Sequence, residues 1–361
     1  MTAPADTGGG GPIEVSGAAA HEAWRRRELP PIETLAGGVH SIPVPMTGHG
    51  MRYVLVYVIE SPAGPVLVDS GWPDEIAWTA LCVGLAEIGM APDGIHGVLV
   101  THAHSDHHGL SGRVRDASGC WIGMHPRDIE LLEQVRSGHA ARQRGTSFLD
   151  LVGAPEEERA TLRELPNELR TSAQAIPDRR IEDGASELVP GRRISARWTP
   201  GHTPGHLVFV DEDRDRAFAG DHLLPRITPN VGSYALTGDP LGDYLSSLTI
   251  VESLPATTEI LPAHEYRFRG VAGRTAAVRE HHRVRLTEIA DVVMTLGSAT
   301  IWEVASGIEW SRGWSATTGR FRRLALAETL AHLRHLEATG LLRRDADSIP
   351  VRWRPTYGRN E

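Results

Sequence analysis

The chain has 361 residues, of which 40% are apolar, so it is long enough for one large domain with a further module. Its formal net charge of −9 argues against a surface made for general binding to nucleic acid or anionic membranes, although a local basic patch is compatible with it. The two cysteines, Cys82 and Cys120, are too few for a disulfide framework.

The N-terminal region carries no targeting or membrane signal. Residues 1–12 have neither the positive charge nor the apolar run of a secretory signal, and no stretch approaches the ~20 apolar residues of a membrane span. The sequence therefore predicts a soluble, cytoplasmic protein without membrane contact. Residues 1–30 are rich in Gly and Ala and then charged, which predicts a flexible N-terminal arm that can include a short helix.

Residues 38–100 alternate strand and helix signals. Three runs rich in β-branched residues predict successive strands over 38–44, 52–59 and 64–68. An apolar period of the helical kind over 74–90 then predicts a helix. The run 93–100 becomes apolar towards its end and predicts a buried strand.

The segment that follows this strand, Thr-His-Ala-His-Ser-Asp-His-His-Gly over residues 101–109, is the most informative in the chain. An extended chain points His102 and His104 the same way, whereas Asp106 and His107 follow a turn and can reach a second ion. A single loop histidine is more often a solvated side chain than a ligand. Four such groups crowded together need a cation to organise them, so the segment predicts a metal site.

The second half repeats the strand-rich pattern after a charged segment. Residues 127–167 predict a helical insertion, which either covers the metal cleft or lies elsewhere as a solvated excursion. Strands are expected near 193–198, 206–211 and 216–219, and a helix over 241–254. Residues 226–239 are expected to form a loop facing the substrate, with Tyr234 as a candidate oxyanion-stabilising or orienting group.

Helical patterns dominate after residue 270, over 273–296, 301–310 and 322–339. Residues 341–344 and 351–354 then predict a short β-ribbon, so the order is helix, helix, wing. Residues 301–361 hold ten arginines against seven acidic residues, a local excess of three positive charges. This excess is small, and leucines at 326, 330 and 333 have the spacing of a docking face, so internal packing is preferred over nucleic-acid binding.

Taken together, the motifs resemble those of the metallo-β-lactamase superfamily, whose H-x-H-x-D-H motif corresponds to residues 102–107. The other four family motifs match Val66–Gly71, Thr199–His206, Phe218–His222 and Leu261–Glu265, in family order. Each of these short motifs is weak alone. Their agreement in type and order over roughly residues 35–270 makes the resemblance specific.

The resemblance implies a site with two metal ions. One would be held by His102, His104 and His202, and the other by Asp106, His107 and His264, with Asp221 touching both. Asp106 and Asp221 would be the catalytic carboxylates, and an open position on each ion indicates catalysis. Two cations that share a water lower its pKa from ~15.7 towards ~7 and so give a bridging hydroxide. Imidazole and carboxylate ligands favour two Zn²⁺ ions, although the set also accepts iron or manganese.

Further residues are expected around the ligands. Asp69 and Thr101 would orient ligand imidazoles or the bridging carboxylate, although Asp69 also suits a plain turn. His206 and His222 flank ligand positions and either line the pocket or are structural histidines. His108 is left outside the site.

The resemblance implies an α/β (α+β) fold, the four-layer αββα sandwich, over residues 31–270. Residues 271–361 would form a C-terminal winged-helix-like module, similar to that of a lactamase-like branch that includes an RNA-cleaving member. The absence of a secretory signal argues against a secreted antibiotic-destroying enzyme.

The leading hypothesis is a dinuclear metallohydrolase, similar to glyoxalase II, that cleaves a small ester, thioester or lactone. The C-terminal module differs from the glutathione-binding domain of glyoxalase II, which argues against specificity for a glutathione thioester and leaves a coenzyme A or carrier-protein thioester open. The alternative is an endoribonuclease that cleaves single-stranded RNA, with C-terminal arginines on the phosphates. A non-catalytic binding protein fits poorly with open metal positions, and a homodimer is compatible with every hypothesis.

Overall fold

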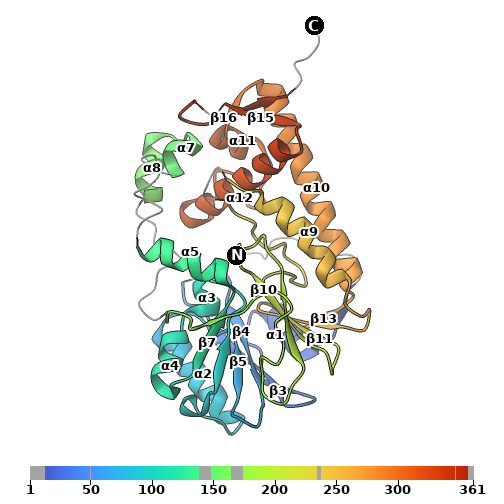
Figure 1. The fold of residues 1–361 in the computed structure, drawn as a ribbon. Helices are drawn as coiled ribbons and strands as arrows, with labels where there is room; N and C mark the ends of the chain where they lie inside the picture. The colour runs from blue at the N-terminus through green and yellow to red at the C-terminus, as the bar shows by residue number, and fades with distance from the viewer. Residues whose placement is uncertain are drawn as a thin grey trace.

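The computed structural model describes residues 13–48, 50–137, 148–163, 174–233, 237–345 and 347–356. Within these ranges, two β-sheets face each other and helices cover their outer faces (Figure 1). This is the αββα sandwich expected from the sequence. None of the helices described is both long and apolar enough to cross a bilayer.

The first sheet has seven strands, hydrogen-bonded in chain order from β2 to β8. Their bounds are Glu33–Leu35 (β2), Val39–Pro45 (β3), Tyr53–Ile59 (β4), Val66–Val68 (β5), Gly97–Leu99 (β6), Trp121–Met124 (β7) and Arg179–Arg180 (β8). Strand β4 is buried on both faces, which suits its unbroken run of β-branched, aromatic and aliphatic residues. Because side chains alternate, Leu55 and Tyr57 lie in the core between the sheets, whereas Val56 packs towards the helices.

Helices α2 (Glu75–Glu87), α4 (Ser111–Ser118) and α5 (Pro126–Arg136) contribute to the core on the outer face of this sheet. Asp74 caps the N-terminus of helix α2, since its carboxylate accepts a hydrogen bond from the Ala77 N–H at 2.7 Å. Just beyond its end, Gly89 has a φ of +75°, a conformation that glycine adopts without strain. These local signals explain why the helix expected over 74–90 forms.

The second sheet has six strands in the order β1, β13, β12, β11, β10, β9. Their bounds are Glu14–Val15 (β1), Phe268–Arg269 (β13), Glu259–Pro262 (β12), Arg216–Gly220 (β11), Leu207–Asp211 (β10) and Ile194–Trp198 (β9). Helices α9 (Pro240–Glu252) and α10 (Val271–Leu296) cover its outer face. Between the sheets, the rings of Tyr57 and Phe218 meet edge to face at 5.4 Å.

The direction of the strands decides where loops gather. Strands β5, β6 and β7 are parallel to one another, and so are β11 and β12. Parallel strands deliver the loops at their carboxyl ends to the same edge of a sheet, where ligands of open α/β sheets bind. The motif residues that follow β5, β6, β11 and β12 are therefore placed at carboxyl edges.

The C-terminal elements form a module with its own hydrophobic core. Short strand β14 (Ala299–Thr300), helices α11 (Ile301–Gly307) and α12 (Gly319–Ala338), and the ribbon of β15 (Leu342–Asp345) and β16 (Arg352–Pro355) follow α10. This is the order helix, helix, ribbon expected from the sequence. Leu326, Leu330 and Leu333 of α12 are fully buried in one cluster with Trp353 of the ribbon, so the leucine stripe packs internally.

The later helices of the insertion after residue 127 pack on this module, whereas its first helix, α5, packs on the first sheet. Its helices α7 (Phe148–Val152) and α8 (Glu156–Arg163) place Leu149, Val152 and Leu162 in the same cluster as the leucines of α12. Figure 1 shows both helices beside α11 and α12. Helices α7 and α8 are therefore not a solvated excursion, because their apolar side chains complete the core of the module.

The N-terminal arm expected over residues 1–30 includes the short helix that was expected, but the part that the structure describes is packed and not flexible. Strand β1 pairs with β13, and helix α1 (Ala18–Arg26) buries Ala20 and Ala23. The ring of Trp24 lies edge-on to Tyr266, with 5.8 Å between the ring centres. A composition rich in Gly and Ala concealed these contacts, since they depend on a strand that is distant in sequence.

Candidate metal centre

Seven imidazole and carboxylate side chains meet at the carboxyl edges of the two sheets. His102, His104, Asp106 and His107 follow β6, His202 lies between β9 and β10, Asp221 follows β11, and His264 follows β12. His107 is fully buried, and none of the seven is exposed. Both cysteines lie elsewhere, Cys82 on α2 and Cys120 just before β7, so the group offers no thiolate.

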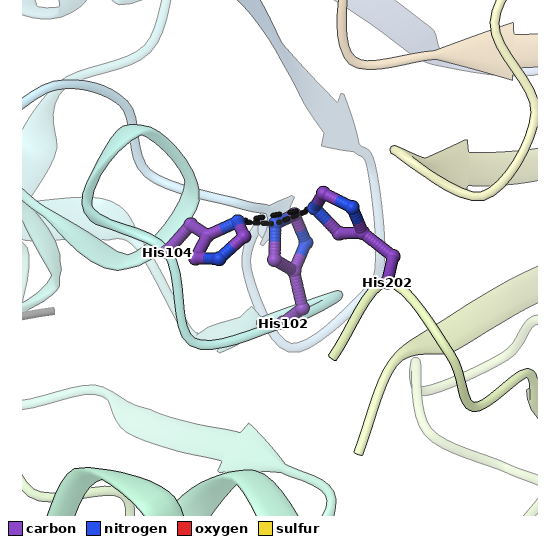
Figure 2. A group of neighbouring side chains, drawn as sticks. All are labelled: His102, His104 and His202. Carbon is purple, nitrogen blue, oxygen red and sulfur yellow. Dashed lines mark hydrogen bonds between the residues drawn. The ribbon is translucent and has the colours of Figure 1, made fainter. Parts of the chain in front are cut away.

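His102, His104 and His202 form the first group, with their ring nitrogens pointing together (Figure 2). Nε2 of His102 lies 2.9 Å from Nδ1 of His104, and Nε2 of His202 lies 3.2 and 3.0 Å from these two atoms. Nitrogens bound at about 2.1 Å to one tetrahedral Zn²⁺ would be roughly 3.3 Å apart. The spacing of these nitrogens therefore fits a single ion.

Asp106, His107 and His264 form the second group. Oδ2 of Asp106 lies 3.3 Å from Nε2 of His264 and 3.6 Å from Nε2 of His107. The carboxylate of Asp221 stands between the groups. Its Oδ1 lies 3.3 Å from Nε2 of His264, and its Oδ2 lies 3.6 Å from Nε2 of His202.

Several atoms of this cluster lack hydrogen-bond partners. Among the described residues, Nε2 of His107, Nε2 of His264 and Oδ1 of Asp221 are buried without one. Each buried polar atom left unpaired costs about 1–3 kcal/mol. A divalent cation would accept lone pairs from all three atoms, so the residues fit a bound metal.

The electrostatics of the cluster agree with this fit. Burial lowers the pKa of His102 well below its ordinary value and that of His104 to about 3, so both rings are neutral and keep their lone pairs. Burial alone would also lower the pKa of His107, but Asp106, Asp69 and Asp221 together raise it well above its ordinary value. The carboxylates thus favour a positive charge here, which is what a cation would supply.

Asp69 and Thr101 lie directly behind this cluster. The Thr101 N–H and hydroxyl donate to the two carboxylate oxygens of Asp69 at 2.8 and 2.9 Å, and Nδ1 of His107 lies 2.7 Å from Oδ2 of Asp69. Asp69 has a positive φ of 63°, which aspartate tolerates better than most residues. Its carboxylate therefore fixes the His107 ring with Nε2 towards the cluster.

The remaining residues expected near the site occupy different places. Nε2 of His206 accepts the Asp221 N–H at 3.2 Å, and its ring stacks on that of His102 at 5.0 Å, so it lies beneath the ligands. His222 is buried one layer further away, edge-on to Tyr244 at 5.4 Å. His108 is outside the cluster, with Nε2 3.0 Å from the Ala175 carbonyl oxygen. Tyr234 lies outside the described residues.

Asp128 is a positioning residue that the sequence analysis missed. Its fully buried carboxylate accepts the Ala103 N–H at 2.8 Å, the Thr203 hydroxyl at 2.8 Å and the Gly205 N–H at 2.6 Å. Burial raises the pKa of Asp128 to about 6, while these three donors act against that shift. The residue ties the loop of His102 and His104 to the loop of His202. No local signal separates it from the charged insertion in which it stands.

We expect Asp128→Ala to lower metal affinity or turnover by about 10- to 100-fold, the usual cost of losing a group that orients ligands. The free energy of unfolding should fall by about 3 kcal/mol or more, since three donors lose their acceptor at about 1–3 kcal/mol each. Metal titration and urea unfolding measure the two effects. Glu130→Ala, on the exposed side of the same helix, is the control and should change stability by no more than about 0.5 kcal/mol. Equal behaviour of the two variants would contradict the positioning role.

Comparison with known proteins agrees with this geometry. Residues 49–264 match the model of the metallo-β-lactamase superfamily. A crystal structure of a metallo-β-lactamase family protein from Thermus thermophilus is 30% identical with a TM-score of 0.73, and the match covers 89% of this chain and 100% of that one.

Two curated relatives extend the comparison. The hydroxyacylglutathione hydrolase GloC of Haemophilus influenzae is 28% identical over 46% of this chain and 63% of its own length. A β-lactamase-like protein 2 homologue of Caenorhabditis elegans is 22% identical over 82% of this chain and 84% of its own. Several other matches span only about a third of the relative, 34% in one case. The family match covers more than half of the chain, and the chain therefore belongs to the metallo-β-lactamase superfamily as a metal-dependent hydrolase.

Proposed function

We propose that the protein is a dinuclear hydrolase, with Zn²⁺ as the preferred metal, that cleaves a small ester, thioester or lactone. The observation that carries the proposal is the position of Asp221, which presents one oxygen to each ligand group. A carboxylate that serves both groups supports two ions close enough to act on one water. Bound in this way, two cations would lower the pKa of that water and supply hydroxide near neutral pH.

The chain's own side chains prepare this chemistry. His102, His104 and His202 offer neutral nitrogens to one ion, while Asp106, His107 and His264 offer a carboxylate and two imidazoles to the other. Asp69 orients His107 from behind, and the Tyr53 carbonyl oxygen does the same for His264, 2.9 Å from its Nδ1. These contacts hold the ligands in place before substrate arrives and reduce reorganisation during the reaction.

The class of substrate is supported by the relatives. The Haemophilus protein is named a hydroxyacylglutathione hydrolase, which places thioesters among the substrates to test. A coenzyme A or carrier-protein thioester is the second class of thioester to test. A parallel assay on acyl-coenzyme A, a lactone and short single-stranded RNA, with the metal-loaded protein, tests the proposal. Cleavage of RNA alone would overturn it. The cytoplasmic location stays a prediction.

The arginines of the C-terminal ribbon bear on the choice between ester hydrolysis and RNA cleavage, because an RNA substrate would need unpaired positive charges near the metal centre. Three of them face acidic partners inside the module: Arg344 lies 3.6 Å from Glu337, Arg352 3.0 Å from Glu303 and Arg354 2.6 Å from Asp345. Figure 1 shows the ribbon at the end of the module away from the two sheets. Because these arginines are paired and remote from the metal centre, a structural role is favoured for them over phosphate binding.

We expect replacement of Arg343, Arg344, Arg352 and Arg354 by Gln to leave turnover of a small ester within about twofold. The ion pairs are partly exposed and each contributes no more than about 1 kcal/mol to stability. Steady-state kinetics measure turnover of the ester, and thermal unfolding measures the change in stability. If RNA were the substrate, binding would weaken and its salt dependence would flatten by roughly one unit per lost phosphate contact. RNA cleavage that needs both these arginines and Asp221 would reverse the ranking.

A further inference from the structure

The loop that follows Asp221 is held mainly by the C-terminal helices. Over residues 224–227 its carbonyl oxygens face Arg274 of α10, which is almost fully buried. Nε of Arg274 donates to the Leu224 oxygen at 2.6 Å, and its Nη2 donates to the oxygens of Arg226 and Ile227 at 2.9 and 2.7 Å. A buried guanidinium that serves three carbonyls of one loop fixes the path of that loop.

Further along, the same loop is tied to α12. The side-chain amide of Asn230 donates to Oε2 of Glu328 at 3.1 Å, and the Ser233 N–H donates to the Ala327 carbonyl oxygen at 3.0 Å. The two contacts fall on adjacent residues of one helical turn. The position of segment 230–233 therefore depends on the position of α12.

The backbone of Asn230 also touches the metal centre. Its carbonyl oxygen lies 2.8 Å from Nδ1 of His202 and accepts the proton of that nitrogen. This bond leaves Nε2 of His202 unprotonated and turned towards His102 and His104, which is the state that a metal ligand requires. The orientation of His202 thus depends on the backbone carbonyl of Asn230. The side chain of the same residue is held by Glu328.

We propose that Glu328 is a positioning residue of the metal centre, and that the C-terminal module holds His202 in its ligand orientation through Asn230. The inference rests on the proposed function, because it takes His202 as a ligand of the first ion. Arg274 and Glu328 both lie beyond residue 264, where the family match ends. The module therefore has a definite role, since α12 supports the ligand set from outside the sandwich.

Glu328 offers a direct test because a conservative variant exists. Gln has nearly the size and shape of Glu, so it is the conservative replacement at this position, where Oε2 of Glu328 accepts from the Asn230 amide at 3.1 Å. Glu328→Gln keeps an oxygen that can accept from Asn230, whereas Glu328→Ala removes it. Glu337→Ala is a matched control on the same helix, since Glu337 pairs with Arg334 and Arg344 rather than with the loop.

The full-length protein is stripped with a chelator and titrated with Zn²⁺ by calorimetry, and the absorption bands of the Co²⁺-substituted protein are recorded. We expect the wild type and Glu337→Ala to bind two equivalents with the same affinities. Glu328→Ala should weaken one equivalent by about 10- to 100-fold and shift the Co²⁺ bands, while Glu328→Gln restores both. Asn230→Ala should resemble Glu328→Ala, and the double variant should add little further loss.

The outcomes separate this inference from the proposed function. Two tight equivalents and an unshifted spectrum in Glu328→Ala would overturn the positioning role of Glu328. A wild type that binds fewer than two ions would instead overturn the dinuclear assignment. Circular dichroism and thermal unfolding monitor the fold of every variant. Equal losses of metal affinity in Glu328→Ala and Glu337→Ala would also count against the inference, since they would indicate a general weakening of α12.

Discussion

Asp221→Ala is expected to reduce turnover by about a thousandfold or more. Asp221 is the side chain whose two oxygens face different ligand groups, one near His264 and the other near His202. Without it, two ions would lose the carboxylate they share, and with it several kcal/mol of stabilisation in the transition state. A loss of about 4 kcal/mol corresponds to a factor of about 10³ in rate. Steady-state kinetics with saturating metal measure the effect.

The same variant should keep most of its fold. The metal content of the variant should fall towards one ion per chain, because the two groups of ligands would no longer share a carboxylate. These groups are His102, His104 and His202, and Asp106, His107 and His264. Asp243→Ala is the control, since Asp243 is exposed on α9. A near-normal rate for Asp221→Ala would refute its role between the two ions.

Removal of the metal should abolish hydrolysis and lower the melting temperature. We expect about two ions per chain by elemental analysis, given two convergent groups and the carboxylate between them. An ion present at a hundred times its Kd stabilises the fold by about 2.7 kcal/mol, which corresponds to a shift of roughly 3–4 °C for a chain of this length. Part of this stabilisation replaces the cost of the unpaired atoms of His107, His264 and Asp221.

Calorimetry before and after chelation measures the shift, and added Zn²⁺ should restore both activity and melting temperature. Mg²⁺ is the control, because it prefers oxygen ligands and should restore neither. A stoichiometry near one after full metal supplementation would contradict the two-ion assignment. An unchanged melting temperature would show that the unpaired atoms are tolerated without a cation.

Much of the fold was predictable because local signals agreed with the tertiary structure. The unbroken apolar run of β4 marked a central strand, and the cap at Asp74 marked the start of α2. The seven side chains of the candidate metal centre could likewise be named, since their motifs are short and appear in order, and the structure brings them together. Composition misled only where the partners are distant, as in α1, whose Trp24 packs on Tyr266.

The amino-acid sequence by itself determined the type and order of the elements, the ligand-capable residues and the chemistry they support. Only the tertiary structure decided which other side chains position these ligand-capable residues. Asp128 lies in a charged helical segment but is buried between two loops, and Glu328 lies on a distant helix but faces Asn230. Such contacts arise where elements far apart in the chain pack together. Hydrophobic periodicity sets which face of a helix is buried, but it does not say which loop that face will meet.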